Sequence, residues 1–167
     1  MNLHTFVVHV ENKPGVLTRV SGLIRRRGFN IESLTVGHAE TEGVSRMTIV
    51  VSTDDFGARR VESNLYKLID VLRVDDITNR PAVTRDLALV KVAVAGHDKA
   101  QLLRVVDETR AHIVDTGEQT MTLEITGEPP HVDAVISRLE PLGIIEMVRT
   151  GQVAMRRGDT ALSAQYT

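Results

Sequence analysis

The chain has 167 residues with 20 basic and 22 acidic side chains, and its formal charge of −2 gives no global attraction to nucleic acid or an anionic membrane. The 42% of hydrophobic and 25% of charged residues are typical of a soluble globular protein with one ordinary domain or two small ones. The absence of cysteine excludes disulfides and thiolate metal sites, and it suits the reducing cytoplasm, where we expect this protein.

The first half of the chain follows the order strand, helix, strand, strand, helix, strand. Short β-branched or alternating segments predict strands over residues 3–10, 30–36, 45–51 and 71–77. The first helix has apolar residues at the spacing of one helical face and ends at a glycine: Val16, Leu17, Val20, Leu23, Ile24 and Gly28. A second helical stripe overlaps the start of the fourth strand: Val61, Leu65, Leu68, Ile69 and Leu72.

The second half repeats this order after a polar, proline-bearing joint at residues 79–82. Strands are predicted over residues 86–94, 112–115, 120–126 and 144–148, with one helix starting near Asp98 and another opened by residues 128–130. We therefore predict an α+β protein with two ferredoxin-like βαββαβ units, each an antiparallel sheet with its helices on one face. The units are residues 3–78 and 79–167, the second ending in a short tail from Gly151.

Each four-stranded unit leaves edge strands, whose unpaired backbone groups invite pairing with another copy. We expect a side-by-side homodimer with a continuous sheet. The alternative, that charged edge residues simply block pairing, is the weaker interpretation.

The turn before the first helix has the character of a binding site for a small anion. A helix N-terminus presents free backbone N–H groups and the positive end of the dipole, and a glycine there lets a ligand approach closely. Asparagine amides stand just before this turn and just after the helix, and an amide oxygen can accept from an ammonium group. Any one of these residues is explained by an ordinary turn, but together they favour an amino acid with an aliphatic side chain: Asn12, Gly15, Val16, Leu17, Asn30 and Ile31.

Two motifs carry a family resemblance. Residues 11–17, ENKPGVL, resemble the loop of ACT domains, which bind regulatory amino acids. Residues 27–36, RGFNIESLTV, with 45–49, SRMTI, resemble the small regulatory subunit of acetohydroxyacid synthase, also called acetolactate synthase. Later segments agree, namely 65–74, 85–92 and 148–151, and the resemblance weakens between residues 95 and 140. One local departure is at residues 37–40, where the family's turn is not matched.

The resemblance implies a first unit that is an ACT regulatory domain and a chain without chemistry or cofactors of its own. Such a subunit binds and activates a separate catalytic subunit, which carries thiamine diphosphate, magnesium and FAD. It also transmits feedback inhibition by valine, or in some members by leucine or isoleucine. By resemblance, Asn12, Gly15, Val16, Leu17, Asn30 and Ile31 form the effector site at the dimer interface, with Asn30 reaching the ligand held by the partner's loop.

The second unit offers no counterpart of this site. Residues 96–98, Gly-His-Asp, open its helix with an acid, and His112 stands near the position that Asn30 would have. In the family this unit helps to dock the catalytic subunit.

Other classes fit the sequence less well. The six histidines lack metal-ligand spacing, neither glycine-rich phosphate motif occurs, and the phosphate loop of acylphosphatases is not recognisable. An RNA-binding RRM would need aromatic side chains on the strand at residues 46–50, which has none. We expect no secretory signal and no membrane span, because the first residues lead directly into a strand and the apolar runs are short. The closer alternative is a free-standing ACT sensor that regulates another enzyme.

Overall fold

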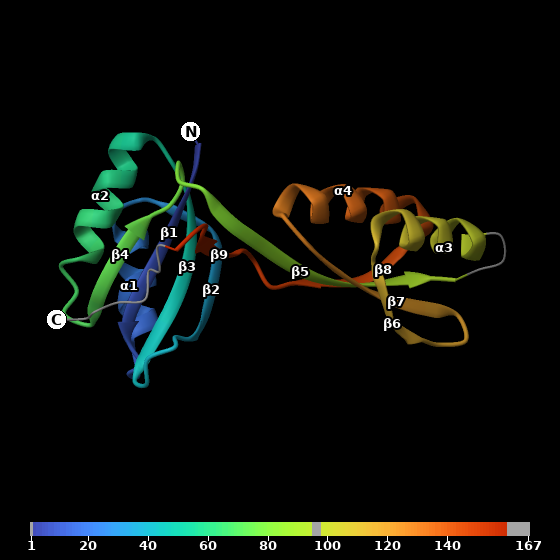
Figure 1. Ribbon diagram of the computed structural model, residues 1–167, viewed down its shortest axis with the longest axis horizontal. Helices are drawn as coiled ribbons and strands as arrows, with labels where there is room; N and C mark the ends of the chain where they lie inside the picture. Colours follow the sequence, from blue (N-terminus) through green and yellow to red (C-terminus); the bar gives the residue numbers. More distant parts are fainter. Residues whose placement is uncertain (1, 95–97, 160–167) are drawn as a thin grey trace. The chain divides into compact units, whose positions relative to one another are not determined.

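The computed structural model of the chain describes residues 2–94 and 98–159 (Figure 1). The chain divides into two compact units. The first comprises the chain up to Val83 and again from Gln152, and the second is Thr84–Gly151. Each unit contains the order β-α-β-β-α-β, so the predicted α+β class with two ferredoxin-like units is confirmed.

The first unit is a four-stranded antiparallel sheet with two helices packed on one face. Its elements are β1 (Asn2–Glu11), α1 (Val16–Arg26), β2 (Asn30–His38), β3 (Val44–Thr53), α2 (Asp55–Leu65) and β4 (Val71–Asp76). The strand order is β2-β3-β1-β4, which leaves β2 and β4 at the edges. Alternate residues of β1, namely Phe6, Val8 and Val10, pack against the apolar sides of α1 and α2.

Helix α2 ends earlier than the apolar stripe predicts. It begins at the N-cap Asp54, whose side chain accepts a hydrogen bond from the Gly57 N–H at 2.6 Å, and it stops at Leu65. Ile69, which was expected on its buried face, is 93% exposed in the turn that follows. The helix does not continue because the following residues pair with the sheet instead: Val71 lies opposite Val10 in the ladder between β4 and β1.

The chain returns to the first unit after the second, which the expected division at residue 79 did not foresee. A short unpredicted strand, β9 (Val153–Arg156), pairs with β5 (Ala82–Ala93), whose first two residues belong to the first unit. Its Ala154 is buried with Val7 and Ile77, on the sheet face opposite Phe6 and Val8. The Arg46 Nη2 donates to the Ala154 carbonyl at 2.7 Å. Ala154 therefore anchors β9 to the first unit, and a strand of four residues is too short to show a periodicity in the sequence.

His9 lies on this same reverse face and couples the stability of the first unit to pH. Its side chain is fully buried, and its Nε2 lies 3.4 Å from the Arg46 Nη1. Burial first and the Arg46 charge second lower the pKa of His9 below its usual 6.5, against weaker opposing effects of Glu40 and Asp75, while Arg73 adds to the lowering. Below pH 6.5 the unfolded chain therefore binds more protons at this site than the folded chain, and stability falls as the pH decreases.

We predict that His9→Gln flattens this pH dependence. The free energy of unfolding of the wild-type chain should fall between pH 7.5 and 5.5, with at most about 1.4 kcal/mol per pH unit coming from this site. Urea denaturation followed by far-UV circular dichroism measures the slope in both proteins, and the difference isolates His9 from the other titrating groups. Identical slopes would contradict the assignment.

The second unit has the same arrangement. Its elements are β5 (Ala82–Ala93), α3 (Asp98–Thr109), β6 (His112–Thr116), β7 (Thr120–Gly127), α4 (Pro129–Leu139), a 3-10 turn (Glu140–Leu142) and β8 (Ile144–Arg149). The strand order is β6-β7-β5-β8, and one face of this sheet packs against α3 and α4. The expected helix opening at Gly96 and His97 lies outside the described residues. Over the described ranges, no helix combines the length and apolar composition needed to cross a membrane.

Candidate effector site

The first half of the candidate site is the loop that leads from β1 into α1. Gly15 is the N-cap of α1 with a φ of 83°, and no side chain among the described residues caps this helix end. A left-handed backbone conformation here is available to glycine without steric cost, which explains the residue. The Val16 N–H lies 3.4 Å from the Lys13 carbonyl and is partly used by the turn. The loop therefore offers main-chain donors at a helix start, as the sequence predicts.

The side chains of the loop play different parts from those expected. Val16 is only 3% exposed and packs in the core, so its main chain, and not its side chain, can face a ligand. Leu17 is 44% exposed and can provide an apolar contact. The Asn12 N–H donates to the Gly43 carbonyl at 2.8 Å, which ties the loop to the turn between β2 and β3.

Arg19 is a residue that the sequence reasoning missed. A Cβ atom built on Gly15 would lie 3.1 Å from the Arg19 Nη1, so this guanidinium stands beside the loop. The Arg19 Nε also donates to the Asp70 Oδ2 at 2.7 Å, and nearby Lys13 pairs with Glu11 at 2.7 Å. The signal was available, because residues four apart share one helix face and Arg19 follows Gly15 at that spacing.

The second half of the candidate site lies beside α1, at the start of β2. Asn30 and Ile31 line a hollow of about 400 Å³ together with Phe29. Residues of α1 form its other side: Thr18, Ser21, Gly22 and Arg25. Asn30 is exposed, and its Nδ2 donates to the Glu32 Oε1 at 2.7 Å. The four predicted site residues of the loop do not line this hollow: Asn12, Gly15, Val16 and Leu17. Within one chain, the six predicted residues thus fall into a loop group and a strand group.

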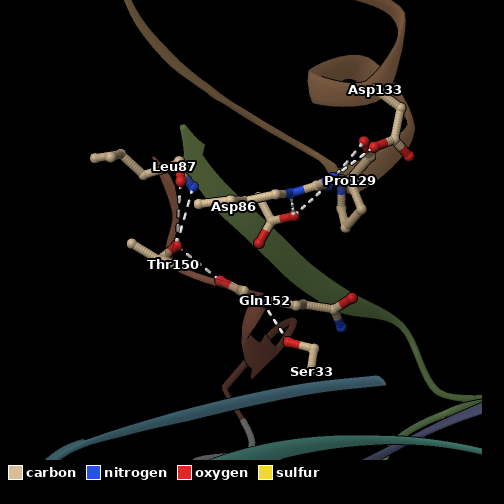
Figure 2. Close-up of polar contacts among 9 residues, drawn as sticks. Ser33, Asp86, Leu87, Pro129, Asp133, Thr150 and Gln152 are labelled. Carbon is tan, nitrogen blue, oxygen red and sulfur yellow. Dashed lines mark hydrogen bonds and ion pairs between the residues drawn. The ribbon is translucent and has the colours of Figure 1, made fainter. Parts of the chain in front are cut away.

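The main polar cluster of the second unit is structural. Where β8 ends, the Arg149 Nε donates to the Asp86 Oδ2 at 2.7 Å and its Nη1 to the Asp133 Oδ1 at 2.6 Å; Figure 2 shows the two carboxylates near Pro129. Thr150 also exchanges hydrogen bonds with the main chain of Leu87 (Figure 2). Burial alone lowers the pKa of Arg149, but its hydrogen bonds to Asp133 and Asp86 outweigh burial and raise it. These contacts hold the strand ends together, and they leave one oxygen of the buried Asp86 carboxylate, Oδ1, without a hydrogen-bond partner among the described residues.

A metal centre finds no support in the described part of the chain, where no group of three or more His, Asp or Glu side chains could hold an ion. His112, which stood near the position equivalent to Asn30, is exposed on the edge strand β6. The second unit therefore has no arrangement like that around Gly15 and Asn30 among its described residues.

The fold of the first unit, with its glycine-opened helix beside the sheet, is that of an ACT domain. Residues 6–73 match the family described as an AHAS small subunit-like ACT domain, and residues 85–158 match the family described as the small subunit of acetolactate synthase. The chain belongs to the acetolactate synthase small-subunit family, as the resemblance implied.

Individual relatives agree over nearly the whole chain. The chain is 47% identical to a probable acetolactate synthase small subunit of Archaeoglobus fulgidus, over 93% of this chain and 98% of that one. It is 43% identical to the acetolactate synthase small subunit of Mycolicibacterium smegmatis, over 96% and 95%. The crystal structure of the acetolactate synthase small subunit from Thermotoga maritima superposes with a TM-score of 0.89 at 38% identity, over 96% of this chain and 100% of that one.

Proposed function

We propose that this chain is the non-catalytic regulatory subunit of acetolactate synthase, which activates the catalytic subunit and makes it sensitive to inhibition by valine. Membership of the acetolactate synthase small-subunit family supports the catalytic subunit of that enzyme as the binding partner. The observation that supports binding of an amino-acid effector is the uncapped start of α1 at Gly15. This helix end presents main-chain donors and has no acidic residue in its first turn. The catalytic subunit carries thiamine diphosphate, magnesium and FAD, and this chain needs none of them to bind an amino acid.

The effector is recognised by its two charged ends and its side chain. Its carboxylate accepts from the main chain at Gly15 and Leu17, where the helix dipole contributes about 0.3–1 kcal/mol. Its ammonium group donates to the Asn30 Oδ1, since the Asn30 Nδ2 is turned towards Glu32. Leu17 and Ile31 are the apolar neighbours of the branched side chain.

The site is completed by a second copy of the chain. The loop group and the strand group are separate within one chain, and β2 is an edge strand that can pair with its counterpart. Gly22 supports this arrangement, because it lines the hollow and a Cβ there would meet only the Arg26 Nη1, at 3.5 Å. A glycine inside a helix costs about 1 kcal/mol relative to alanine, and close approach of another backbone accounts for it.

Inhibition follows if valine binds one arrangement of this dimer better than another, with a coupling free energy of about 1–3 kcal/mol. The test is reconstitution with the catalytic subunit and titration with valine, leucine and isoleucine. We expect the chain to raise the activity and valine to reverse the effect. If no thiamine-dependent partner co-purifies and no activation occurs, while an amino acid still binds, the free-standing ACT sensor is the correct alternative.

Asn30→Ala is expected to weaken valine binding roughly 10- to 100-fold, because it removes a charge-assisted hydrogen bond of about 1.5–3 kcal/mol. Calorimetry on the full chain measures the affinity directly. Asn79→Ala is the matched control, since Asn79 is also exposed but lies in the connection between β4 and β5. Wild-type affinity in Asn30→Ala would remove the proposed role of this residue.

A further inference from the structure

Glu32 fixes the way in which the Asn30 amide is turned. The Asn30 Nδ2 lies 2.7 Å from the Glu32 Oε1. A carboxylate offers only acceptors, so the amide must present its NH₂ group to Glu32. The Asn30 Oδ1 then points away from Glu32 and is free of this contact. Without such a partner, an asparagine amide can turn over and present either end, because nothing in its own chemistry distinguishes the two orientations.

The backbone at Glu32 is a β-bulge. In the ladder between β2 and β3, Ile31 lies opposite Val51 and Ser33 lies opposite Val50, so Glu32 is the extra residue. Bulges re-aim side chains and are frequent next to functional sites. Glu32 is exposed, and neither core packing nor strand pairing calls for a carboxylate at this position. The hydrogen bond to Asn30 gives it a role.

We propose that Glu32 is a positioning residue of the effector site, which turns the Asn30 amide so that Oδ1 meets the ammonium group of the bound amino acid. The site then selects an α-amino acid over the same carboxylic acid without its amino group. This inference rests on the proposed function and assigns it a residue that the six predicted ones did not include.

The test compares two ligands that differ only in the ammonium group, L-valine and 3-methylbutanoate, by calorimetry on the full chain. Glu32→Gln keeps the shape of the side chain but can also donate, so it no longer dictates the orientation of Asn30. We expect this variant to bind valine about tenfold more weakly and 3-methylbutanoate unchanged. We also expect Asn30→Ala/Glu32→Gln to bind valine no more weakly than Asn30→Ala alone, because Glu32 acts through Asn30.

Glu42→Gln is the matched control. Glu42 is exposed in the turn between β2 and β3, and the substitution removes the same charge, so valine affinity should stay at the wild-type value. The inference is overturned if Glu32→Gln binds valine like the wild type, if it weakens both ligands equally, or if its loss adds to that of Asn30→Ala. A wild-type chain that binds none of the three branched-chain amino acids gives a different result, which overturns the proposed function itself.

Discussion

Gly15→Asp is expected to abolish inhibition by valine while the chain still activates the catalytic subunit. The new carboxylate would occupy the place of the ligand's carboxylate at the start of α1. Two like charges about 4 Å apart near a protein surface repel by about 4 kcal/mol, which corresponds to roughly a thousandfold in affinity. Aspartate is also a favoured N-cap residue, so its side chain would accept from the donors that the ligand needs. Arg19, 3.1 Å from the new Cβ, would attract it further.

The matched control for this variant is Gly143→Asp. Gly143 has a φ of 84°, against 83° for Gly15, and both are exposed. The nearest atom to a Cβ at Gly143 is the Ala93 Cβ at 3.9 Å, so the substitution adds the same charge at a similar positive φ in the other unit. Titration of the reconstituted enzyme should show normal inhibition with Gly143→Asp. An unchanged inhibition midpoint in Gly15→Asp would show that the ligand's carboxylate lies elsewhere.

The order of the helices and strands was predictable because most of them bury one face, and their apolar residues therefore recur at helical or strand spacing in the sequence. In α1, the buried residues are four of the five that the stripe named, Val16, Val20, Leu23 and Ile24. The period fails where two patterns overlap. The apolar residues after Leu65 continue the helical spacing by accident, and pairing of Val71 with Val10 decides their conformation. Sequence spacing carries no information about such a distant partner.

The tail shows the same limit in another form. Residues 153–156 have no pattern of their own, and Ala154 becomes buried only because Val7 and Ile77 leave a place for it. A strand of four residues is too short for alternation to stand out from chance. Its position depends on a surface that exists only after the first sheet has formed.

For the candidate site, the sequence placed the main-chain features better than the side chains. Glycine before a helix and asparagine after one are local signals, and the structure has Gly15 at the N-cap and Asn30 at the first residue of β2. Whether a side chain points to the core or to the solvent depends on the helix face, and the structure has Val16 in the core and its neighbour Leu17 exposed. The contact between Asn30 and Glu32 depends on a bulge, and bulges leave no clear mark in a single sequence.

Arg149→Met is expected to destabilise the second unit by about 3–5 kcal/mol, since it leaves the Asp86 carboxylate buried without a cation. Asp86 is 4% exposed, and its Oδ1 has no hydrogen-bond partner among the described residues even with Arg149 present. Urea denaturation followed by far-UV circular dichroism measures the loss. The matched control is Arg138→Met, whose ion pair with Glu108 has side chains that are 44% and 60% exposed. Exposed pairs contribute about 0–1 kcal/mol, so this control should unfold nearly like the wild type.

The double variant Asp86→Asn/Arg149→Met separates the charge from the packing. If the unpaired charge causes most of the loss, removing it should make the double variant more stable than Arg149→Met alone, although the asparagine keeps polar atoms in a buried place. The arginine stem also covers apolar surface, and methionine replaces much of that contact. A double variant as unstable as Arg149→Met would mean that the stem's packing, and not the charge on Asp86, determines the stability of this strand end.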